Sequence, residues 1–207
     1  HGEVGLPLAR FAQWAWVSFK LAGLAALLAT SIALLLGFSL RLRESVALRL
    51  SARVVSLGYA VPGAVIAVGI LLPVGWLQER FPQLGSAALV TGTLFGLMYA
   101  YLVRFSAVAL QSIEAGYARV PTSIDETAHL LGASRRRMFL ELHAPLLRRA
   151  GLAAMLLVFV DVMKELPATL VLRPFNSDTL AVVAYQLARD ERLGEAALPS
   201  LAIVLVG

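Results

Sequence analysis

The sequence predicts an all-α integral membrane protein, a polytopic helical bundle of about five core spans with a helix-turn-helix loop on its cytoplasmic side. Of the 207 residues, 59% are hydrophobic and only 15% are charged, whereas about 25% of the residues are charged in an ordinary soluble domain. Three runs, 21–40, 54–78 and 81–103, contain no Asp, Glu, Lys or Arg. About 18 such residues suffice for a membrane-spanning helix.

The membrane spans are expected within one domain that covers residues 1–207. Their approximate limits are 16–40, 54–77, 86–104, 150–170 and 196–207. The second span contains Pro62 and Pro73, and charged residues interrupt the fourth span after Val160. The last span is truncated by the end of the sequence, and the chain begins with His1 rather than Met. We therefore expect this chain to be a fragment of a longer protein.

The distribution of arginine predicts which side of the membrane each loop faces. Ten arginines lie between the first two spans and in the polar stretch 111–149, at positions 41, 43, 49, 53, 119, 135, 136, 137, 148 and 149. Five lie in the segments expected on the opposite side, at positions 10, 80, 173, 189 and 192. Because cytoplasmic loops are enriched in Lys and Arg, we expect loop 111–149 in the cytoplasm and the N-terminus of this chain outside.

Several classes of function find no support in the residues. The chain has no Cys, so thiolate metal sites and Cys nucleophiles are excluded. It has no G-x-x-x-x-G-K-[ST] motif for binding ATP and no convergent catalytic set. We therefore expect no catalytic residues, no resident cofactor and no metal site. The net charge of +5 comes from short Arg clusters between spans, which is typical of membrane orientation and not of nucleic-acid binding.

The most specific local pattern lies in the loop 111–149. Ser123 and Glu126 fit a capping box that starts a helix, and Gly132 is placed to end it in the left-handed conformation. Ser134 can cap a second short helix, which is expected to end before Pro145 because the residue before a proline disfavours helical geometry. The sequence thus predicts two helices joined by a tight turn.

This helix pair has an apolar side that lipid cannot cover from the cytoplasm. It consists of Leu130, Leu131, Met138, Phe139 and Leu142. Two explanations stay open: the side folds back onto the chain's own spans, or a partner protein covers it.

The same loop resembles the EAA loop of permease subunits of binding-protein-dependent ABC importers. The resemblance rests on the spacing of Glu126, Thr127, Ala128, Gly132, Leu142, Ala144 and Pro145, with Thr127 and Ala144 departing mildly from the family's usual residues. It implies that the loop is a coupling helix seated in a groove of a cytoplasmic ATPase subunit. The coupling residues that it implies are Glu126, Thr127, Ala128, Leu131, Gly132, Ala133, Phe139, Leu142 and Pro145.

A second stretch, residues 158–207, resembles the C-terminal half of ferric-iron importer permeases, in which a KELPxTLxLRPF…TLA pattern recurs. This implies a multi-pass protein of the bacterial inner membrane that forms the pathway for a substrate, ferric iron, delivered by a periplasmic binding protein. The implied partners are that protein, ATPase subunits that hold ATP and Mg, membrane lipid and a second permease module. The chain itself is then not an enzyme, and its N-terminus is periplasmic.

Four residues near the middle of the fourth span are candidates for the translocation path: Asp161, Lys164, Glu165 and Pro167. Charged groups at membrane depth are costly unless they are paired or face water. Asp161 and Lys164 can neutralise each other, and Pro167 allows a bend just beyond them. A structural ion pair and a direct role in gating or passing the cargo both stay open.

Two alternatives to iron import are kept. One is an importer of the same superfamily for thiamine, a polyamine, sulfate or a phosphonate. The other is an ion-coupled secondary transporter with Asp161 and Glu165 as ion carriers, which leaves the helix pair in the loop unexplained.

Overall fold

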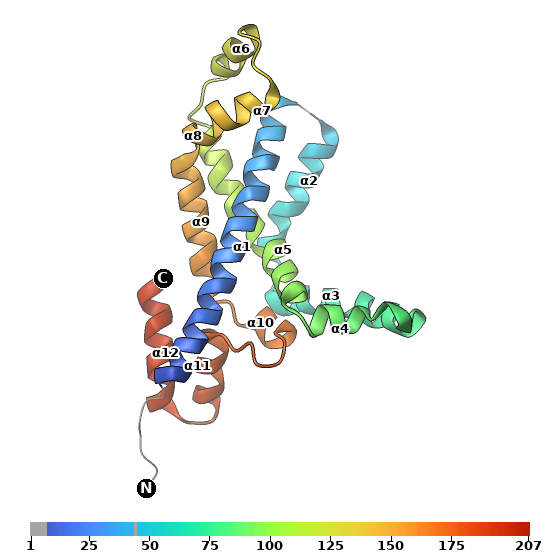
Figure 1. Ribbon diagram of the computed structural model, residues 1–207, viewed down its shortest axis with the longest axis vertical. Coiled ribbons are helices and arrows are strands. Elements are labelled where there is room, and N and C mark those ends of the chain that lie inside the picture. Colours follow the sequence, from blue (N-terminus) through green and yellow to red (C-terminus); the bar gives the residue numbers. More distant parts are fainter. Residues whose placement is uncertain (1–7, 44) are drawn as a thin grey trace. The chain divides into compact units, whose positions relative to one another are not determined.

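The computed structural model describes residues 8–43 and 45–207, and within these ranges it contains helices and turns but no strand (Figure 1). The α-helices are α1 Leu8–Leu42, α2 Val46–Leu57, α3 Gly63–Arg80, α4 Ser86–Thr91, α5 Leu94–Tyr117, α6 Ser123–Leu130, α7 Arg135–Arg137, α8 Ala144–Leu146, α9 Arg148–Met163, α10 Pro167–Leu172, α11 Leu180–Arg189 and α12 Leu193–Val206. Short 3₁₀ turns occupy Gly58–Ala60 and Pro82–Leu84, and a π-helical segment, η3, occupies Met138–His143. The predicted all-α class is confirmed.

Two helices, α1 and α5, are each long and apolar enough to cross a membrane. Helix α1 has 35 residues and is therefore about 52 Å long at about 1.5 Å per residue, more than the roughly 30 Å of a bilayer's hydrocarbon core. It extends the first expected span at both ends. Helices α2 and α3 together satisfy the same criterion as one broken span.

The structure breaks the second expected span, 54–77, into two helices. The chain leaves helical geometry at Val61 and Pro62, and α3 begins at Gly63. Pro62 has no N–H to donate and disfavours helical geometry in the residue before it. Pro73, in contrast, lies inside α3.

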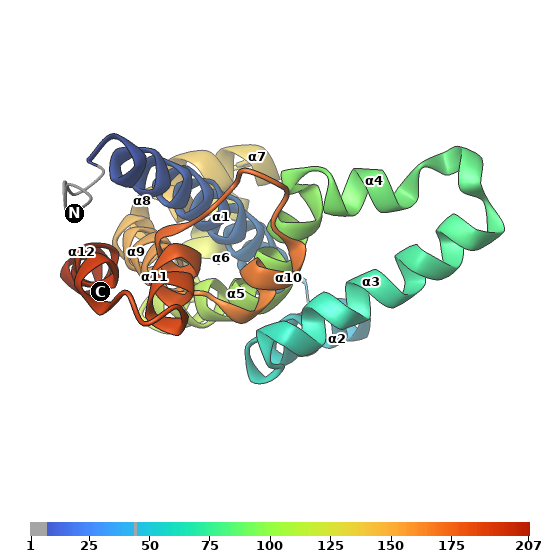
Figure 2. The ribbon, with the colours of Figure 1, turned by 90° about the horizontal axis from the view of Figure 1, so that it is seen from below.

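The third expected span, 86–104, is also divided, because the chain bends at Gly92 and Thr93 between α4 and α5. Helices α3 and α4 pack against each other as the two arms of a hairpin (Figure 2). A Cβ atom at Gly96 of α5 would lie 2.5 Å from the carbonyl oxygen of Val90 in α4, so the small residue permits the tight bend between α4 and α5. Helix α5 then continues to Tyr117, well into the stretch that we expected to be a loop.

The chain divides into two compact units. Unit 1 comprises His1–Ala25, Val61–Leu102 and Phe159–Gly207, and unit 2 comprises Ala26–Ala60 and Val103–Val158. The core of unit 1 includes Leu21, Leu97, Tyr101, Leu172, Leu180 and Val182, and that of unit 2 includes Ala29, Ala33, Leu110, Ile113, Met138 and Leu147. The buried alanines lie on one face of α1 and leave room for neighbouring helices to approach.

Candidate functional site

Helix α6 begins at Ser123, as predicted, but the capping box does not form. Thr122 occupies the N-cap position with helical backbone angles and no side-chain cap bond. Ser123 lies inside the helix, where its carbonyl oxygen accepts a hydrogen bond of 2.8 Å from the Thr127 hydroxyl. Asp125 and Glu126 in the first turn complement the helix dipole instead.

The turn after α6 confirms the prediction for Gly132. Its φ of 74° is left-handed, and its N–H donates to His129 O while Ala133 N–H donates to Ala128 O. These two bonds make a Schellman motif, which fixes the direction in which the chain leaves the helix. Ser134 then caps the next helix as predicted, because its Oγ accepts from Arg137 N–H at 3.3 Å.

The second helix does not end before Pro145, as the sequence suggested. It widens into the π-helical segment η3 and continues as α8, with Pro145 in the first turn of α8. A proline ring in a helix clashes with the carbonyl group four residues earlier, and the wider π turn relieves such a clash. The widening therefore lets the helix pass the proline.

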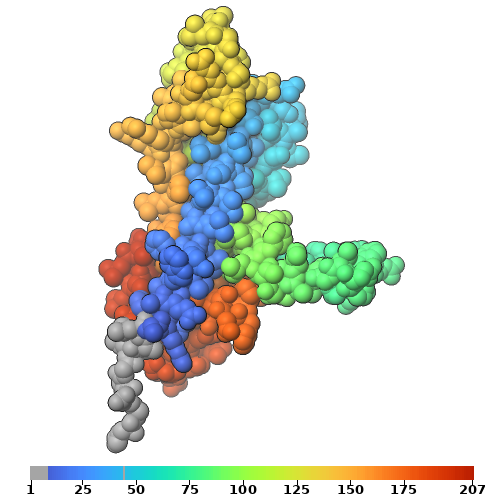
Figure 3. Space-filling view, viewed as in Figure 1, coloured from blue at the N-terminus to red at the C-terminus, as the bar shows by residue number. Residues whose placement is uncertain are grey.

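The apolar side of the helix pair is divided between two environments. Met138 is 1% exposed and Phe139 packs on Phe38 of α1, with 5.0 Å between the ring centres. Leu130 and Leu131, in contrast, are 89% and 80% exposed. They belong to the segment that forms the tip of unit 2 in Figure 3. The first explanation therefore holds for Met138 and Phe139, whereas the chain's own helices leave Leu130 and Leu131 exposed.

The residues implied for coupling surround this tip. Ala128, Leu131 and Leu142 line both of two adjoining shallow hollows. Exposed residues of the set are Glu126, Thr127, Leu131, Gly132 and Pro145, and partly buried ones are Ala128, Ala133, Phe139 and Leu142.

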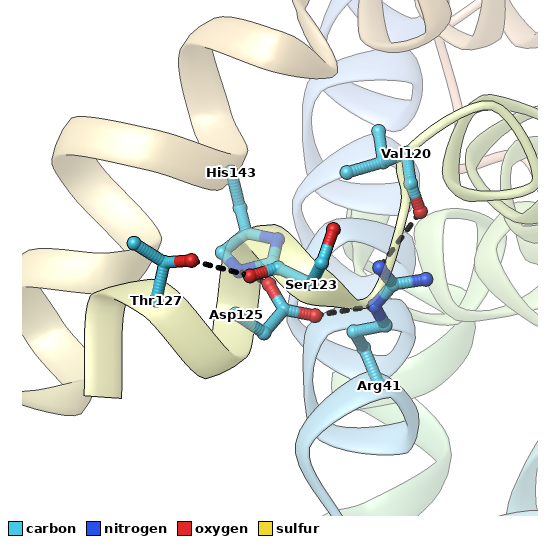
Figure 4. A network of polar contacts seen from close by, with 6 residues as sticks. All are labelled: Arg41, Val120, Ser123, Asp125, Thr127 and His143. Atoms are coloured by element: carbon cyan, nitrogen blue, oxygen red, sulfur yellow. Dashed lines mark hydrogen bonds and ion pairs between the residues drawn. The ribbon is translucent and has the colours of Figure 1, made fainter. Parts of the chain in front are cut away.

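Three charged or titratable side chains meet at the base of the helix pair, and we name Arg41, Asp125 and His143 the junction cluster (Figure 4). Arg41 Nε donates to Asp125 Oδ2 at 2.6 Å, and Arg41 Nη2 donates to Val120 O at 2.7 Å. On the other side of the carboxylate, His143 Nε2 lies 3.0 Å from Asp125 Oδ1. The cluster thus joins α1, the segment before α6, α6 itself and η3.

Aromatic rings enclose the imidazole of His143, which has no accessible side-chain surface. The ring centres of Phe38 and Tyr117 lie 4.9 and 5.5 Å from that of His143. Burial lowers the pKa of His143 below its ordinary value, and Arg41 acts in the same direction, while the nearby Asp125 carboxylate opposes them. The imidazole is therefore neutral at pH 7.

Sequence reasoning missed the junction cluster. Arg41 and Asp125 are separated by 84 positions, and no local pattern links His143 to either of them.

Among the path candidates, Asp161 and Lys164 form the expected ion pair, with 3.0 Å between Oδ1 and Nζ. Pro167 is the first residue of α10, so the break in the fourth expected span falls before it, between α9 and α10. Proline is well tolerated there because the first N–H of a helix has no partner within the helix.

Glu165 lies in this break and is 5% exposed. Its two carboxylate oxygens accept the backbone N–H groups of Ala168 and Thr169, each at 3.1 Å. The Thr169 hydroxyl lies 2.9 Å from Glu165 Oε2 and 2.6 Å from the Tyr101 hydroxyl. The carboxylate thereby satisfies backbone groups that the break exposes.

Residues 8–43 and 45–207 contain no group of three or more His, Asp or Glu side chains arranged to hold a metal ion.

Comparison with known proteins agrees with this geometry. The family described as "Binding-protein-dependent transport system inner membrane component" matches residues 21–206. A solved structure, a bacterial alginate ABC transporter in complex with an alginate pentasaccharide-bound periplasmic protein, shares the fold with a TM-score of 0.66 over 95% of this chain and 75% of that one, at 12% identity.

Two curated relatives are permease proteins. The Fe(3+)-transport system permease protein FbpB 2 of Haemophilus influenzae is 29% identical over 190 residues, which are 91% of this chain and 35% of that protein. The putative 2-aminoethylphosphonate transport system permease protein PhnV of Salmonella typhimurium is 30% identical over 147 residues, 71% of this chain and 51% of that protein. The chain spans about a third to a half of these relatives. Since the family match covers nearly the whole sequence, the chain belongs to the inner membrane components of binding-protein-dependent transport systems, a family of multi-pass permeases and not of enzymes.

Proposed function

We propose that this chain is a transmembrane module of an ATP-driven ABC importer and that α6, α7, η3 and α8 are its coupling helices. ATP and Mg are bound by separate cytoplasmic ATPase subunits. A periplasmic binding protein delivers the cargo, which passes between this module and a second permease module.

The exposure of Leu130 and Leu131 carries this proposal. Two adjacent leucines in water at the end of a rigidly closed turn are unfavourable unless a partner covers them. The Schellman motif and the Ser134 cap hold them at the tip. This is what insertion into a groove of another protein requires.

The proposed mechanism is alternating access. Closure of two ATPase subunits around ATP moves the coupling helices, and the membrane helices turn from inward-open to outward-open. Such transitions proceed as rigid-body movements of packed elements between two arrangements.

A crosslink between the coupling helices and the ATPase tests the proposal. The chain has no Cys, so Ala128→Cys in the full-length protein provides a single thiol beside both hollows. We expect it to crosslink to a single Cys in the groove of a co-expressed ATPase subunit, with a yield that changes when ATP is added. Ala118→Cys, at an exposed position after the end of α5, is the matched control and should not crosslink.

Absence of the crosslink in a properly inserted protein would contradict the proposal. It would leave the helix pair as a self-packed element and favour the ion-coupled secondary transporter.

We further propose ferric iron as the cargo. The iron-transport relative is matched over 91% of this chain and the phosphonate-transport relative over 71%. Uptake of radiolabelled ferric iron and of radiolabelled 2-aminoethylphosphonate by the complete transporter separates the two. Transport of the phosphonate alone would assign the chain to the second group.

For Asp161, Lys164, Glu165 and Pro167 we propose a packing role. Supporting this, Asp161 is paired with Lys164, and both oxygens of Glu165 are engaged by backbone amides of α10. These bonds hold the carboxylate at the start of α10.

A further inference from the structure

We propose that the junction cluster fastens the coupling helices to the cytoplasmic end of α1, so that a push on α6 moves this membrane helix. Arg41 and Asp125 are then positioning residues, which act through α6 without touching the ATPase. This inference rests on the proposed function and adds the device that transmits the movement.

The first observation is that α6 has few buried side chains that could hold it in place. Among its eight residues, Asp125 is the single buried one. Short helices in proteins are usually held by an apolar face packed on a core. Helix α6 is held instead through a carboxylate that lies between a guanidinium and an imidazole.

The second observation is the position of Arg41, in the last turn of α1. Its guanidinium binds Asp125 of α6 and the carbonyl of Val120, and lies 5.7 Å from the ring of Tyr117 at the end of α5. The Arg41 side chain thus contacts the end of α5, the segment that follows it and α6. Charge-assisted bonds away from water are strong and directional.

The third observation is that the second coupling helix is held on the same face of α1. Phe139 and His143 pack on Phe38, and Phe38 and Arg41 are three positions apart, one above the other on the helix. His143 then meets Asp125 from the side opposite to Arg41. Both coupling helices therefore converge on one turn of α1, and neither can tilt without disturbing the other.

If the junction cluster transmits movement, its loss should uncouple transport from ATP hydrolysis. A side chain that only stabilises the fold changes how much complex forms, but it leaves unchanged the number of molecules transported per ATP hydrolysed. A cluster that transmits movement changes this ratio.

The test uses the full-length chain with its ATPase subunits and binding protein in liposomes. Asp125→Asn alone leaves the partly buried Arg41 without a charged partner, which endangers folding. The double variant Arg41→Met with Asp125→Leu removes both charges together, and such replacements are often neutral for stability. Asp190→Asn, which breaks an exposed pair with Arg189, is the matched control.

We expect the double variant to assemble and to hydrolyse ATP, while uptake of radiolabelled ferric iron or 2-aminoethylphosphonate per ATP falls roughly tenfold, within the usual range of coupling between two sites. Asp190→Asn should keep the ratio of the unaltered protein. A double variant with the unaltered ratio would overturn the junction cluster's role and leave the proposed function intact. An unaltered chain that binds no ATPase would overturn both.

Discussion

The imidazole of His143 is a titratable group without access to water, placed where two helices of the loop meet α1. Burial and the Arg41 guanidinium lower the pKa of this imidazole, against the opposing effect of the Asp125 carboxylate. Protonation would place a second positive charge in a pocket that already contains the Arg41 guanidinium. The packing of this junction is therefore linked to pH.

We expect the stability of the protein to fall as the pH is lowered from about 6.5, the ordinary pKa of histidine. In the unfolded chain His143 binds a proton near that pH, whereas the folded chain resists protonation until a lower pH. The unfolded state then binds more protons, so acid favours it. Thermal unfolding in detergent, followed by circular dichroism at about pH 7.5 and 5.5, should show this fall.

The His143→Gln variant is the control for this measurement, because it has no group that titrates in this range. It should lose part of the pH dependence. The same pH dependence in the variant and in the unaltered protein would show that other groups cause it.

The two turn residues Gly132 and Ser134 could be predicted because their roles depend only on neighbours within four positions. The role of Asp125 could not be predicted, because its carboxylate accepts a hydrogen bond from Arg41, which is far away in the sequence. The contact between Asp125 and Arg41 also helps to explain why the capping box does not form. Asp125 is buried, and Thr122 occupies the N-cap position with helical geometry, so Ser123 is the first residue of the helix and does not cap it.

At the scale of helices, the 3₁₀ turn Gly58–Ala60 and α5 approach each other closely within unit 2. A Cβ atom at Gly58 would lie 1.9 Å from the carbonyl oxygen of Val103. The obstacle is backbone, which cannot swing aside as a flexible side chain does. The crossing therefore depends on the absence of a side chain at this position.

Gly58→Ala should destabilise the protein by about 1–3 kcal/mol or more, because α5 or the turn must move to admit the methyl group. Gly151→Ala in α9 is the matched control, since nothing lies within 4 Å of its Cβ position. That substitution should be neutral or stabilise the helix by up to about 1 kcal/mol. Thermal unfolding of both variants in one detergent gives the comparison, and equal melting temperatures would contradict the proposed clash.

The helix breaks could not be predicted from hydropathy. A charge-free run indicates that a segment tolerates lipid, but it does not indicate that the segment is one helix. The breaks at Val61–Pro62, Gly92–Thr93 and before Pro167 each leave backbone groups that need new partners. Glu165 supplies those partners for α10 through bonds to residues three and four positions further along the chain, and a hydropathy profile does not register such bonds.

At the scale of the whole molecule, composition was sufficient for the fold class, because a chain this apolar must form helices that satisfy their own backbone within lipid. Orientation depends on a different property, the bias of arginine between loops. The ten arginines on one side and five on the other predict that α6 lies in the cytoplasm and the turn between α11 and α12 in the periplasm.

Single cysteines report this orientation. Thr122→Cys and Asp190→Cys both place a thiol at an exposed position. In intact cells, a maleimide that crosses the outer membrane but not the inner one should label position 190 and not position 122. After the inner membrane is opened, both should react. The reverse pattern would show that the chain is inserted the other way round.

The exposed leucines at the tip also have a cost for the cell. Under the proposed function, a copy of this chain without its ATPase leaves Leu130 and Leu131 uncovered, and chaperones and proteases recognise such apolar surface. We therefore infer that unassembled copies are short-lived and that the abundance of the chain follows that of its ATPase. The same two side chains would then serve both in transport and as a mark of incomplete assembly.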